Sequence, residues 1–408
     1  MSPAPQTLSR STLMFPLALV LFEFAVYMGN DLIQPAMLAI TRDFGVGANL
    51  APSAMSFYLF GGACVAWLLG PLSDRIGRRR VLLTGALFFA LCCILILFTQ
   101  NMQQFLTMRL VQGIGLTVVS AVGYAAIQES FAERDAIKVM ALMSNISLLA
   151  PLLGPVVGAF LIDYVSWHWG FIGIAVVTLI AWFGLNKSMP KQQQSVTKKP
   201  FNTLFQDFKQ VFSNKKFLAL GLALPLGNMP LMLWIALSPV MLVDELKLSS
   251  FAYGLSQFPV FIGLIAGNIV LIKIMDRFEL GRTVLVGVPM MCFGALFLLA
   301  AVFVPAHALA LILIGMTIIS FGEGLCFSVL YRFALMSSDV SKGTVAASLS
   351  MLIMFSFFVF IEVGRWLYMQ WHLMAFACSC LAFLAIWLLY PRVFLMQVMK
   401  ERREAGTF

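Results

Sequence analysis

The stretch Gly70-Pro71-Leu72-Ser73-Asp74-Arg75-Ile76-Gly77-Arg78-Arg79-Arg80 lies between two long apolar runs in the first half of the chain. A weaker copy, Asp276-Arg277-Phe278-Glu279-Leu280-Gly281-Arg282, follows at a separation of about half of the 408 residues. Each copy separates the second apolar run of its half from the third. This repetition predicts that the chain consists of two copies of one helical bundle.

The composition indicates an integral membrane protein. Hydrophobic residues make up 61% of the chain and charged residues only 11%, and the mean hydropathy is +0.93. Long apolar windows recur along the whole length, as multi-pass membrane proteins require. The net charge of +9 does not indicate nucleic-acid binding, because the cations gather in short loops between the apolar runs.

Metal, disulfide and enzyme chemistry have no support in the sequence. The seven cysteines lie inside apolar runs without a C-x-x-C pair, and the three histidines stand singly at the ends of runs. No nucleophile with a paired base and no phosphate-binding loop is present. We therefore expect no enzyme activity, no metal and no cofactor other than a proton gradient.

We expect an all-α membrane protein with twelve transmembrane helices in two pseudo-symmetric six-helix bundles, since each crossing needs about twenty apolar residues. The expected spans are 13–37, 51–72, 80–99, 103–129, 136–162, 168–187, 217–243, 251–275, 283–303, 307–331, 344–369 and 371–391.

The domains expected from these spans are an N-terminal bundle at 1–187, a cytoplasmic linker at 188–216 and a C-terminal bundle at 217–408. The linker is the one long polar insertion. Phe201, Leu204, Phe205 and Phe208 recur in it at helical spacing, which predicts a short amphipathic helix on the membrane surface.

The distribution of cations predicts the orientation. With a cytoplasmic N-terminus, only Arg42, Lys247 and Arg365 lie in or beside outer loops, and Arg109 lies within a span. The other lysines and arginines are then cytoplasmic, as the positive-inside rule requires. Both termini are expected in the cytoplasm.

Charges inside the bilayer are the candidate functional groups, because buried ionisable groups are costly there. Glu23 and Asp31 lie on the first span, about 12 Å apart along the axis and about 80° apart around it. Tyr27 is four residues from each, and Asn30 adjoins Asp31. This polar stripe must face protein or water. An alternative is that the acids are held by hydrogen bonds for packing alone.

A buried carboxyl group can exchange a proton for a ligand. Burial favours its neutral form and a nearby cation favours its charged form. Cargo that brings positive charge, excludes water or breaks a hydrogen bond then competes with the proton. Competition at a shared site is the simplest coupling that gives antiport, because protons from the more acidic side reload the empty site.

Arg109 is the only cation deep in an apolar run, followed by Gly113 and Gly115 on the fourth span. The glycines allow close helix packing, and the guanidinium needs an anionic or carbonyl partner. We expect it to sense the protonation of Asp31 or Glu23, the alternative being a static ion pair that fixes helix register.

Two further acids, Glu323 and Glu362, lie in the tenth and eleventh spans and are weaker candidates. Arg365 offers Glu362 a partner one helical turn away. The fifth span contains Pro151, Gly154, Pro155 and Gly158. The prolines bend a helix and the glycines form a small-xxx-small packing face, which suits a seam during rocking motions.

These segments resemble the major facilitator superfamily, and within it the twelve-helix drug/proton antiporters. Gly70–Arg80 matches the superfamily's loop motif, the Arg109 segment its fourth-helix motif, and Ala150–Ala159 its antiporter motif. The stretches at 27–35, 122–130 and 341–345 are similar to MdfA-type multidrug exporters. The resemblance covers nearly the whole chain.

The resemblance implies roles for individual residues. Glu23 and Asp31 would take part in proton and drug binding, with Arg109 supporting the coupling. Residues implied to line the drug cavity are Tyr27, Asn30, Met143, Ser147, Tyr253 and Gln257. Residues implied to latch the cytoplasmic side are Gly70, Asp74, Arg75, Gly77 and Arg78, with Arg332 in a similar role.

The function implied is export of lipophilic neutral and cationic drugs, such as chloramphenicol and quaternary ammonium dyes, driven by protons across a bacterial inner membrane. The partners expected are these small drugs, protons and the lipid bilayer around a monomer, without nucleic acid. The alternative is a substrate-specific facilitator or proton symporter of the same superfamily for a small metabolite. For that alternative we would expect a more polar cavity and not two acids in the first span.

Overall fold

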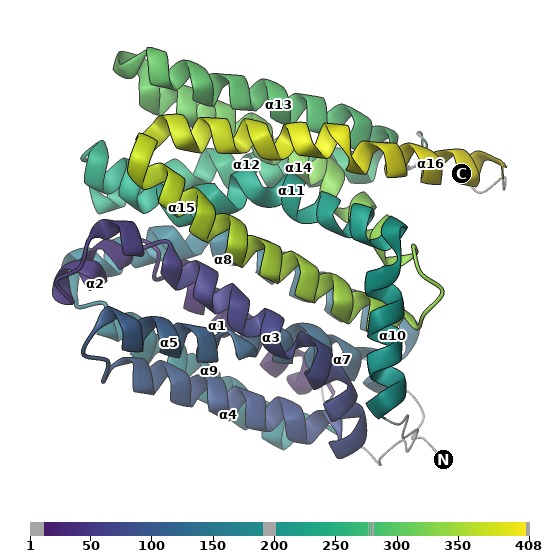
Figure 1. Ribbon diagram of the computed structural model, residues 1–408. Helices are drawn as coiled ribbons and strands as arrows, with labels where there is room; N and C mark the ends of the chain where they lie inside the picture. The colour runs from purple at the N-terminus through teal and green to yellow at the C-terminus, as the bar shows by residue number, and fades with distance from the viewer. Residues whose placement is uncertain (1–11, 191–200, 276, 278, 280, 405–408) are drawn as a thin grey trace. The chain divides into compact units, whose positions relative to one another are not determined.

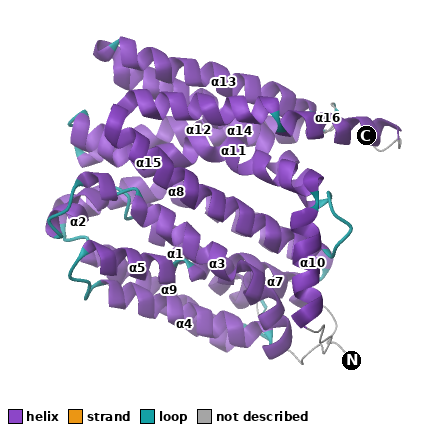
Figure 2. Cartoon of the chain, in the orientation of Figure 1, coloured by secondary structure: helices purple, strands orange, loops and turns teal. Residues whose placement is uncertain are grey.

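The computed structural model describes residues 12–190, 201–275, 277, 279 and 281–404, leaving out the side chains of several residues within 133–148 and 201–204 and that of residue 402. Over these residues the chain is almost entirely helical and contains no strand (Figure 2). The all-α membrane fold expected from the sequence is confirmed. Asp276 of the second loop motif lies outside the described residues.

The chain divides into two compact units, Met1–Thr203 and Leu204–Phe408. The domain limits expected from the sequence, 1–187, 188–216 and 217–408, remain a prediction. Figure 1 shows the elements of the first unit in purple and blue, turning to teal in its last helix. They are α1 (Met14–Asp31), α2 (Met37–Asp43), η1 (Ala48–Leu50), α3 (Ser53–Ile76), α4 (Arg78–Ile96), α5 (Met102–Gln112), α6 (Ile114–Thr117), the π-helix η2 (Val118–Gly123), α7 (Tyr124–Ser130), α8 (Glu133–Tyr164) and α9 (His168–Ser188).

The second unit begins within α10 (Phe201–Ser213) and is drawn in teal, green and yellow. Its elements are α11 (Lys215–Ser238), the π-helix η3 (Pro239–Glu245), α12 (Ser250–Ile274), α13 (Arg282–Phe303), η4 (Pro305–His307), α14 (Ala308–Leu335), α15 (Lys342–Leu389) and α16 (Pro391–Glu404).

Short polar residues begin several helices. The side chains of Asn101, Asn214 and Ser249 accept hydrogen bonds from backbone N–H groups in the first turns of α5, α11 and α12. Such caps satisfy N–H groups that have no partner within the helix. Both copies of the loop motif turn at a glycine with positive φ, 98° at Gly77 and 105° at Gly281. A side chain would be strained at either glycine, although the two turns differ in ψ, which is 133° at Gly77 and −26° at Gly281.

The expected spans fall on these helices. Within the described part of the chain, ten helical stretches are long and apolar enough to cross a membrane. One of them, Lys342–Glu401, covers two expected spans. The non-helical residue His372 separates these two spans within α15. Figure 1 shows the chain reversing within α15. A shorter apolar stretch, Leu149–Tyr164 of α8, accounts for the fifth span.

Two of the expected spans differ from the structure. The first helix ends at Asp31 and not at residue 37. Pro35, which has no backbone N–H to donate, lies in the turn that follows, and α2 begins after this turn. The fourth span forms one helical stretch, Met102–Ser130, but its α-helix is interrupted after Gln112 and again by the π-helix η2. The helix α10 lies inside the expected linker at 188–216 and reaches Ser213, one residue before the Asn214 cap of α11.

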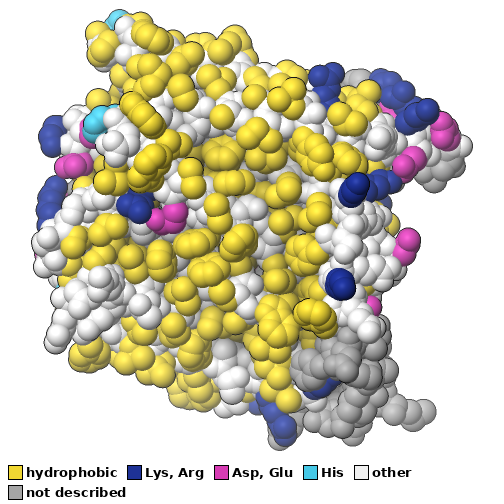
Figure 3. Space-filling model, in the orientation of Figure 1, with side chains coloured by type: hydrophobic (Ala, Val, Ile, Leu, Met, Phe, Trp, Pro, Cys, Tyr) yellow, Lys and Arg dark blue, Asp and Glu magenta, His cyan; other side chains and the backbone are white. Residues whose placement is uncertain are grey.

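The surface suits a lipid environment. Large apolar side chains on the helix flanks are exposed, such as Phe183 at 67% and Phe303 at 70%. Figure 3 shows hydrophobic side chains over most of the visible face and charged side chains mainly toward the helix ends. Water would make such flanks costly, whereas acyl chains do not.

Candidate functional site

Glu23 is a buried acid in the middle of α1. Its side chain is completely inaccessible to solvent. The Tyr124 hydroxyl of α7 donates a hydrogen bond to Glu23 Oε1 at 3.1 Å. The other carboxyl oxygen, Oε2, is buried without a hydrogen-bond partner among the described residues. Among the described residues, therefore, only one of the two oxygens of this carboxyl group forms a hydrogen bond.

Asp31 is the last residue of α1 and is 5% exposed. Asn30 Nδ2 donates a hydrogen bond to Asp31 Oδ1 at 3.0 Å. The C-terminal end of a helix carries the negative pole of its dipole, which disfavours a second negative charge. Because burial also disfavours the charge, the protonation of Asp31 depends strongly on what lies beside it.

The glycines of α8 bring that helix against the end of α1. A methyl group at Gly158 would lie 1.9 Å from the Leu32 carbonyl oxygen, and one at Gly154 would lie 2.9 Å from the Asp31 carbonyl carbon. No side chain fits in either space. The close approach expected for the small-xxx-small face is present, and the backbone that it contacts carries Asp31. Pro151 and Pro155 both lie inside α8.

Arg109 on α5 is buried, with 1% of its surface exposed. Its guanidinium donates to the carbonyl oxygens of Gly29 at 2.9 Å and Ala54 at 3.2 Å. It also donates to Gln112 Oε1 at 2.5 Å and to Asn30 Oδ1 at 3.2 Å. Three segments of the chain, from α1, α3 and α5, are thus joined through one cation.

An aromatic ring completes the surroundings of Arg109. The guanidinium carbon lies 4.4 Å from the centroid of the Tyr58 ring, a distance at which the ring face attracts a cation. The Tyr58 hydroxyl in turn donates to the Val26 carbonyl of α1 at 2.8 Å.

Arg109 reaches Asp31 through Asn30. Among the described residues Arg109 forms no ion pair within 4 Å, with either Glu23 or Asp31. Asn30 accepts from Arg109 and donates to Asp31, so a single amide connects the two charged groups. The static ion pair considered from the sequence is therefore not seen within the described part of the chain. A role of Arg109 in sensing protonation stays a prediction.

The other residues implied to line the drug cavity are distributed over both units. In the first unit, Tyr27 is half-buried and Met143 of α8 is buried, while the side chain of Ser147 lies outside the described residues. In the second unit, Tyr253 and Gln257 are buried on α12. Gln257 Oε1 accepts a hydrogen bond from Trp234 Nε1 at 2.7 Å. Their contact with cargo remains a prediction.

The loop motif forms a network around Arg78. Its guanidinium makes an ion pair with Asp74 one turn earlier and a second with Glu129 of α7 at 2.9 Å. It also donates to the hydroxyl of Ser73 and to the Gly70 carbonyl oxygen, the latter at 3.4 Å. Arg78 therefore ties the ends of α3, α4 and α7 together. Arg332 is exposed near the end of α14.

The second copy of the motif uses different partners. Arg403 of α16 donates to both carboxyl oxygens of Glu279, at 2.8 and 2.7 Å, and Arg282 lies 3.5 Å from the same carboxylate. The hydrogen bonds from Arg403 lower the pKa of Glu279 below its usual value. The C-terminal helix is thereby attached to the loop between α12 and α13.

The chain has a repeated glycine turn, a buried polar first helix and an arginine bound to backbone carbonyls. Its sequence can be compared with those of known proteins. The model of the Major Facilitator Superfamily matches residues 19–361. The chain belongs to the major facilitator superfamily. As a member of this family of transporters it is a multi-pass membrane protein.

Two relatives of this superfamily member cover nearly its full length. It is 70% identical over 395 residues to the chloramphenicol resistance protein CraA of Acinetobacter baumannii, covering 97% of this chain and 96% of that protein. It is 45% identical over 359 residues to the multidrug transporter MdfA of Escherichia coli, covering 88% of each. The fold is also that of a D-xylose-proton symporter structure, with a TM-score of 0.75, 15% identity and coverage of 92% and 97%.

Sequence reasoning about this superfamily member missed several contact residues. Tyr124 and Glu129 stand in a stretch that was singled out, yet their partners Glu23 and Arg78 lie far away in the sequence. Tyr58 gave no signal, because an isolated polar residue in an apolar helix is common. Only the packing of helices identifies what each one contacts.

Proposed function

We propose that the protein is a proton-driven multidrug efflux antiporter of a bacterial inner membrane, with both termini in the cytoplasm. Its cargo would be lipophilic neutral drugs such as chloramphenicol and cationic drugs such as quaternary ammonium dyes. Protons and drugs would compete at Glu23 and Asp31. The names of the two relatives, one a chloramphenicol resistance protein and one a multidrug transporter, support the cargo class.

The observation that carries the proposal is the environment of the two acids. Both are buried on one helix, and neither has a cation as direct partner among the described residues. Glu23 keeps one carboxyl oxygen without a partner, and Asp31 meets Arg109 only through an amide. An acid that is not fixed by an ion pair can release its proton when a ligand changes its surroundings.

Arg109 can report that release without binding cargo. Its hydrogen bonds to Asn30 and to the Gly29 carbonyl connect it to the last turn of α1. When Asp31 loses its proton, the attraction between the carboxylate and the guanidinium increases, and Asn30 is the group between them. The proton state of Asp31 would thereby affect the packing of α1 against α3 and α5.

The membrane potential is sufficient to drive export. Exchange of one inward proton for one neutral drug moves one charge, which is worth about 2.3 kcal/mol at about 100 mV. That energy supports a drug gradient of roughly fifty-fold. Exchange of one proton for one monovalent cation moves no net charge and would depend on the pH difference alone.

Liposomes test the proposal. The purified protein is reconstituted with a pH indicator inside, and chloramphenicol or a quaternary ammonium dye is added with and without an imposed pH gradient. We expect cargo movement to cause opposite movement of protons, and the double variant Glu23→Gln, Asp31→Asn to abolish it. Arg392→Lys, which alters an exposed arginine of α16, serves as a control for reconstitution.

Two results would contradict the proposal. Drug movement without proton movement would indicate a facilitator. Proton movement in the same direction as cargo would indicate a symporter, the alternative considered from the sequence.

A further inference from the structure

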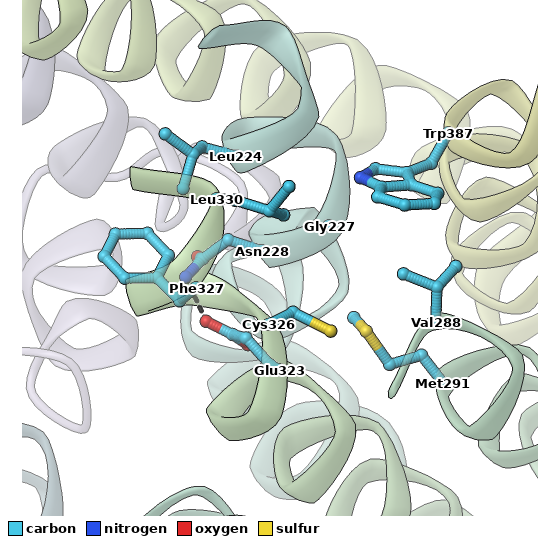
Figure 4. A pocket seen from close by; sticks show the side chains of 10 residues that line it. All are labelled: Leu224, Gly227, Asn228, Val288, Met291, Glu323, Cys326, Phe327, Leu330 and Trp387. Carbon is cyan, nitrogen blue, oxygen red and sulfur yellow. Dashed lines mark hydrogen bonds between the residues drawn. The ribbon is translucent and has the colours of Figure 1, made fainter. Parts of the chain in front are cut away.

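A third buried acid lies in the second unit, on a helix that the proposed proton exchange does not use. Glu323 of α14 is only 4% exposed. Asn228 of α11 donates a hydrogen bond from Nδ2 to Glu323 Oε1, which Figure 4 shows as a dashed line. The two side chains therefore connect α11 with α14 inside this unit.

One oxygen of each side chain remains without a partner. Glu323 Oε2 and Asn228 Oδ1 are both buried, and neither forms a hydrogen bond to any described residue. In an ionised carboxylate both of these atoms are acceptors, so they cannot pair with each other. Two buried acceptors without hydrogen-bond partners are costly.

A proton removes this mismatch. A carboxylic acid has one O–H donor and one acceptor oxygen, and a primary amide offers the complementary acceptor and donor. The first of the two possible hydrogen bonds, from the amide nitrogen to Oε1, already exists. A proton on Oε2 would supply the second by donating to Asn228 Oδ1, and the pair would then close into a ring with two hydrogen bonds.

We propose that Glu323 and Asn228 form a proton-binding site within the second unit, in which binding of a proton adds a second hydrogen bond between α14 and α11. The proposal goes beyond the proposed function, because the site lies outside the unit that carries Glu23 and Asp31. It depends on these two side chains and not on which cargo is exported.

The surroundings support a neutral, proton-exchanging acid. Glu323 and Asn228 line a cavity of about 10 Å³, at the lower limit for one water molecule, which could carry a proton to or from the acid. No lysine, arginine or histidine is among the described residues that line it, and Cys326 is the only other titratable group. The remaining lining residues are Leu224, Gly227, Val288, Met291, Phe327, Leu330 and Trp387.

The position of the pair gives the proton a structural effect. Asn228 lies between Pro225 and Pro230 of α11, two residues without a backbone donor that weaken the helix there. Glu323 lies between Gly322 and Gly324 of α14. A change from one to two hydrogen bonds between α11 and α14 therefore acts where α11 is easiest to bend.

Infrared difference spectroscopy of the purified full-length protein tests the site directly. A protonated carboxyl group has its own C=O stretching band, which disappears on ionisation. We expect a pH change between about 5 and 9 to alter protonated-carboxyl bands in the wild type, where Glu23 and Asp31 also contribute, and Glu323→Gln to remove one of these bands. The amide introduced by Glu323→Gln can form both hydrogen bonds to Asn228, so this variant should fold.

Two further variants give the comparison its specificity. Asn228→Ala removes the amide but keeps the acid, so the Glu323 band should remain and move to higher frequency. Glu362→Gln alters another acid of the same unit, one that accepts a hydrogen bond from Arg365 Nε at 3.0 Å. Because Glu362 already has this cationic partner, the control should leave the protonated-carboxyl bands unchanged.

The proposal is wrong if the wild-type and Glu323→Gln spectra show the same bands over this pH range. It is equally wrong if the Glu323 band is present at every pH, or if Asn228→Ala leaves its frequency unchanged. None of these spectra requires transport. A failure of drug/proton exchange in liposomes is thus distinct from a failure of this site.

Discussion

Gly154 of α8 lies so close to Asp31 of α1 that a methyl group on the glycine would come within 2.7 Å of the Asp31 Cβ. Helix packing and the candidate proton site are therefore one structural feature. The packing helps to bury Asp31, and the absence of a side chain at Gly154 is what permits the approach.

Gly154→Ala should separate α8 from α1 and impair transport. Overpacking of this kind costs about 2 kcal/mol, and the displaced backbone is the one that carries Asp31. We expect a lower melting temperature in detergent and a loss of drug-driven proton movement in liposomes.

Gly173→Ala on α9 is the matched control, because a methyl group there meets nothing within 4 Å. That variant should behave as the wild type. Normal stability and normal transport in Gly154→Ala would mean that the close packing on Asp31 is dispensable.

The sequence was informative where chemistry is local. The lengths of the apolar runs predicted the helices. Buried acids and the single buried arginine stood out because charges are rare in apolar runs. These features depend on residue type and spacing, which a sequence displays directly.

The sequence could not give the partners of those charges. Arg109 was expected to meet an acid or a carbonyl group, and which one depends on how α1, α3 and α5 cross. In the same way, Asn228 becomes notable only because α11 places it beside Glu323. The end of the first helix at Asp31 was also missed, since the apolar pattern continues beyond it.

Glu23 and Asp31 should differ in their effect on cargo. A drug cation can replace the proton on an acid by direct attraction, whereas a neutral drug cannot. We expect Glu23→Gln to reduce binding of a quaternary ammonium dye about tenfold, equivalent to about 1.4 kcal/mol, and to affect chloramphenicol less. Asp31→Asn should stop proton exchange with both cargoes.

Binding of each cargo is measured by equilibrium titration, and proton exchange is measured in liposomes. Equal losses for both cargoes in Glu23→Gln would contradict a charge-selecting role.

Arg109→Lys should be strongly destabilising, although it keeps the charge. One ammonium group cannot reach the separate acceptors on Gly29, Ala54 and Asn30 that the guanidinium contacts at once. Leaving buried acceptors unpaired costs about 1–3 kcal/mol each, so we expect a loss of about 3 kcal/mol. Thermal unfolding in detergent measures it, with Arg392→Lys as an exposed control. A melting temperature equal to that of the control would mean that these hydrogen bonds contribute little.

Asp74→Asn should slow export with little change in drug affinity. The substitution removes one of the two carboxylates that pair with Arg78 and leaves Glu129 in place. The ends of α3, α4 and α7 would then be held less firmly, which alters conformational rates and not the drug cavity. Transport rate and equilibrium binding are measured on the same preparation. A collapse of affinity would instead indicate that the motif is needed for folding.

Acidification should remove the contribution of Arg403 to stability. Because Arg403 lowers the pKa of Glu279 below its usual value of 4.5, the pair stabilises the folded state at neutral pH. This stabilisation is fully present above the unfolded-state pKa and is lost as the pH falls through the lower, folded-state value. Arg403→Gln should therefore reduce the melting temperature at neutral pH, and the difference from the wild type should shrink on acidification below about pH 4.5. Arg392→Gln on the same helix is the control. A difference that is independent of pH would show that Arg403 stabilises α16 through packing and not through the charge of Glu279.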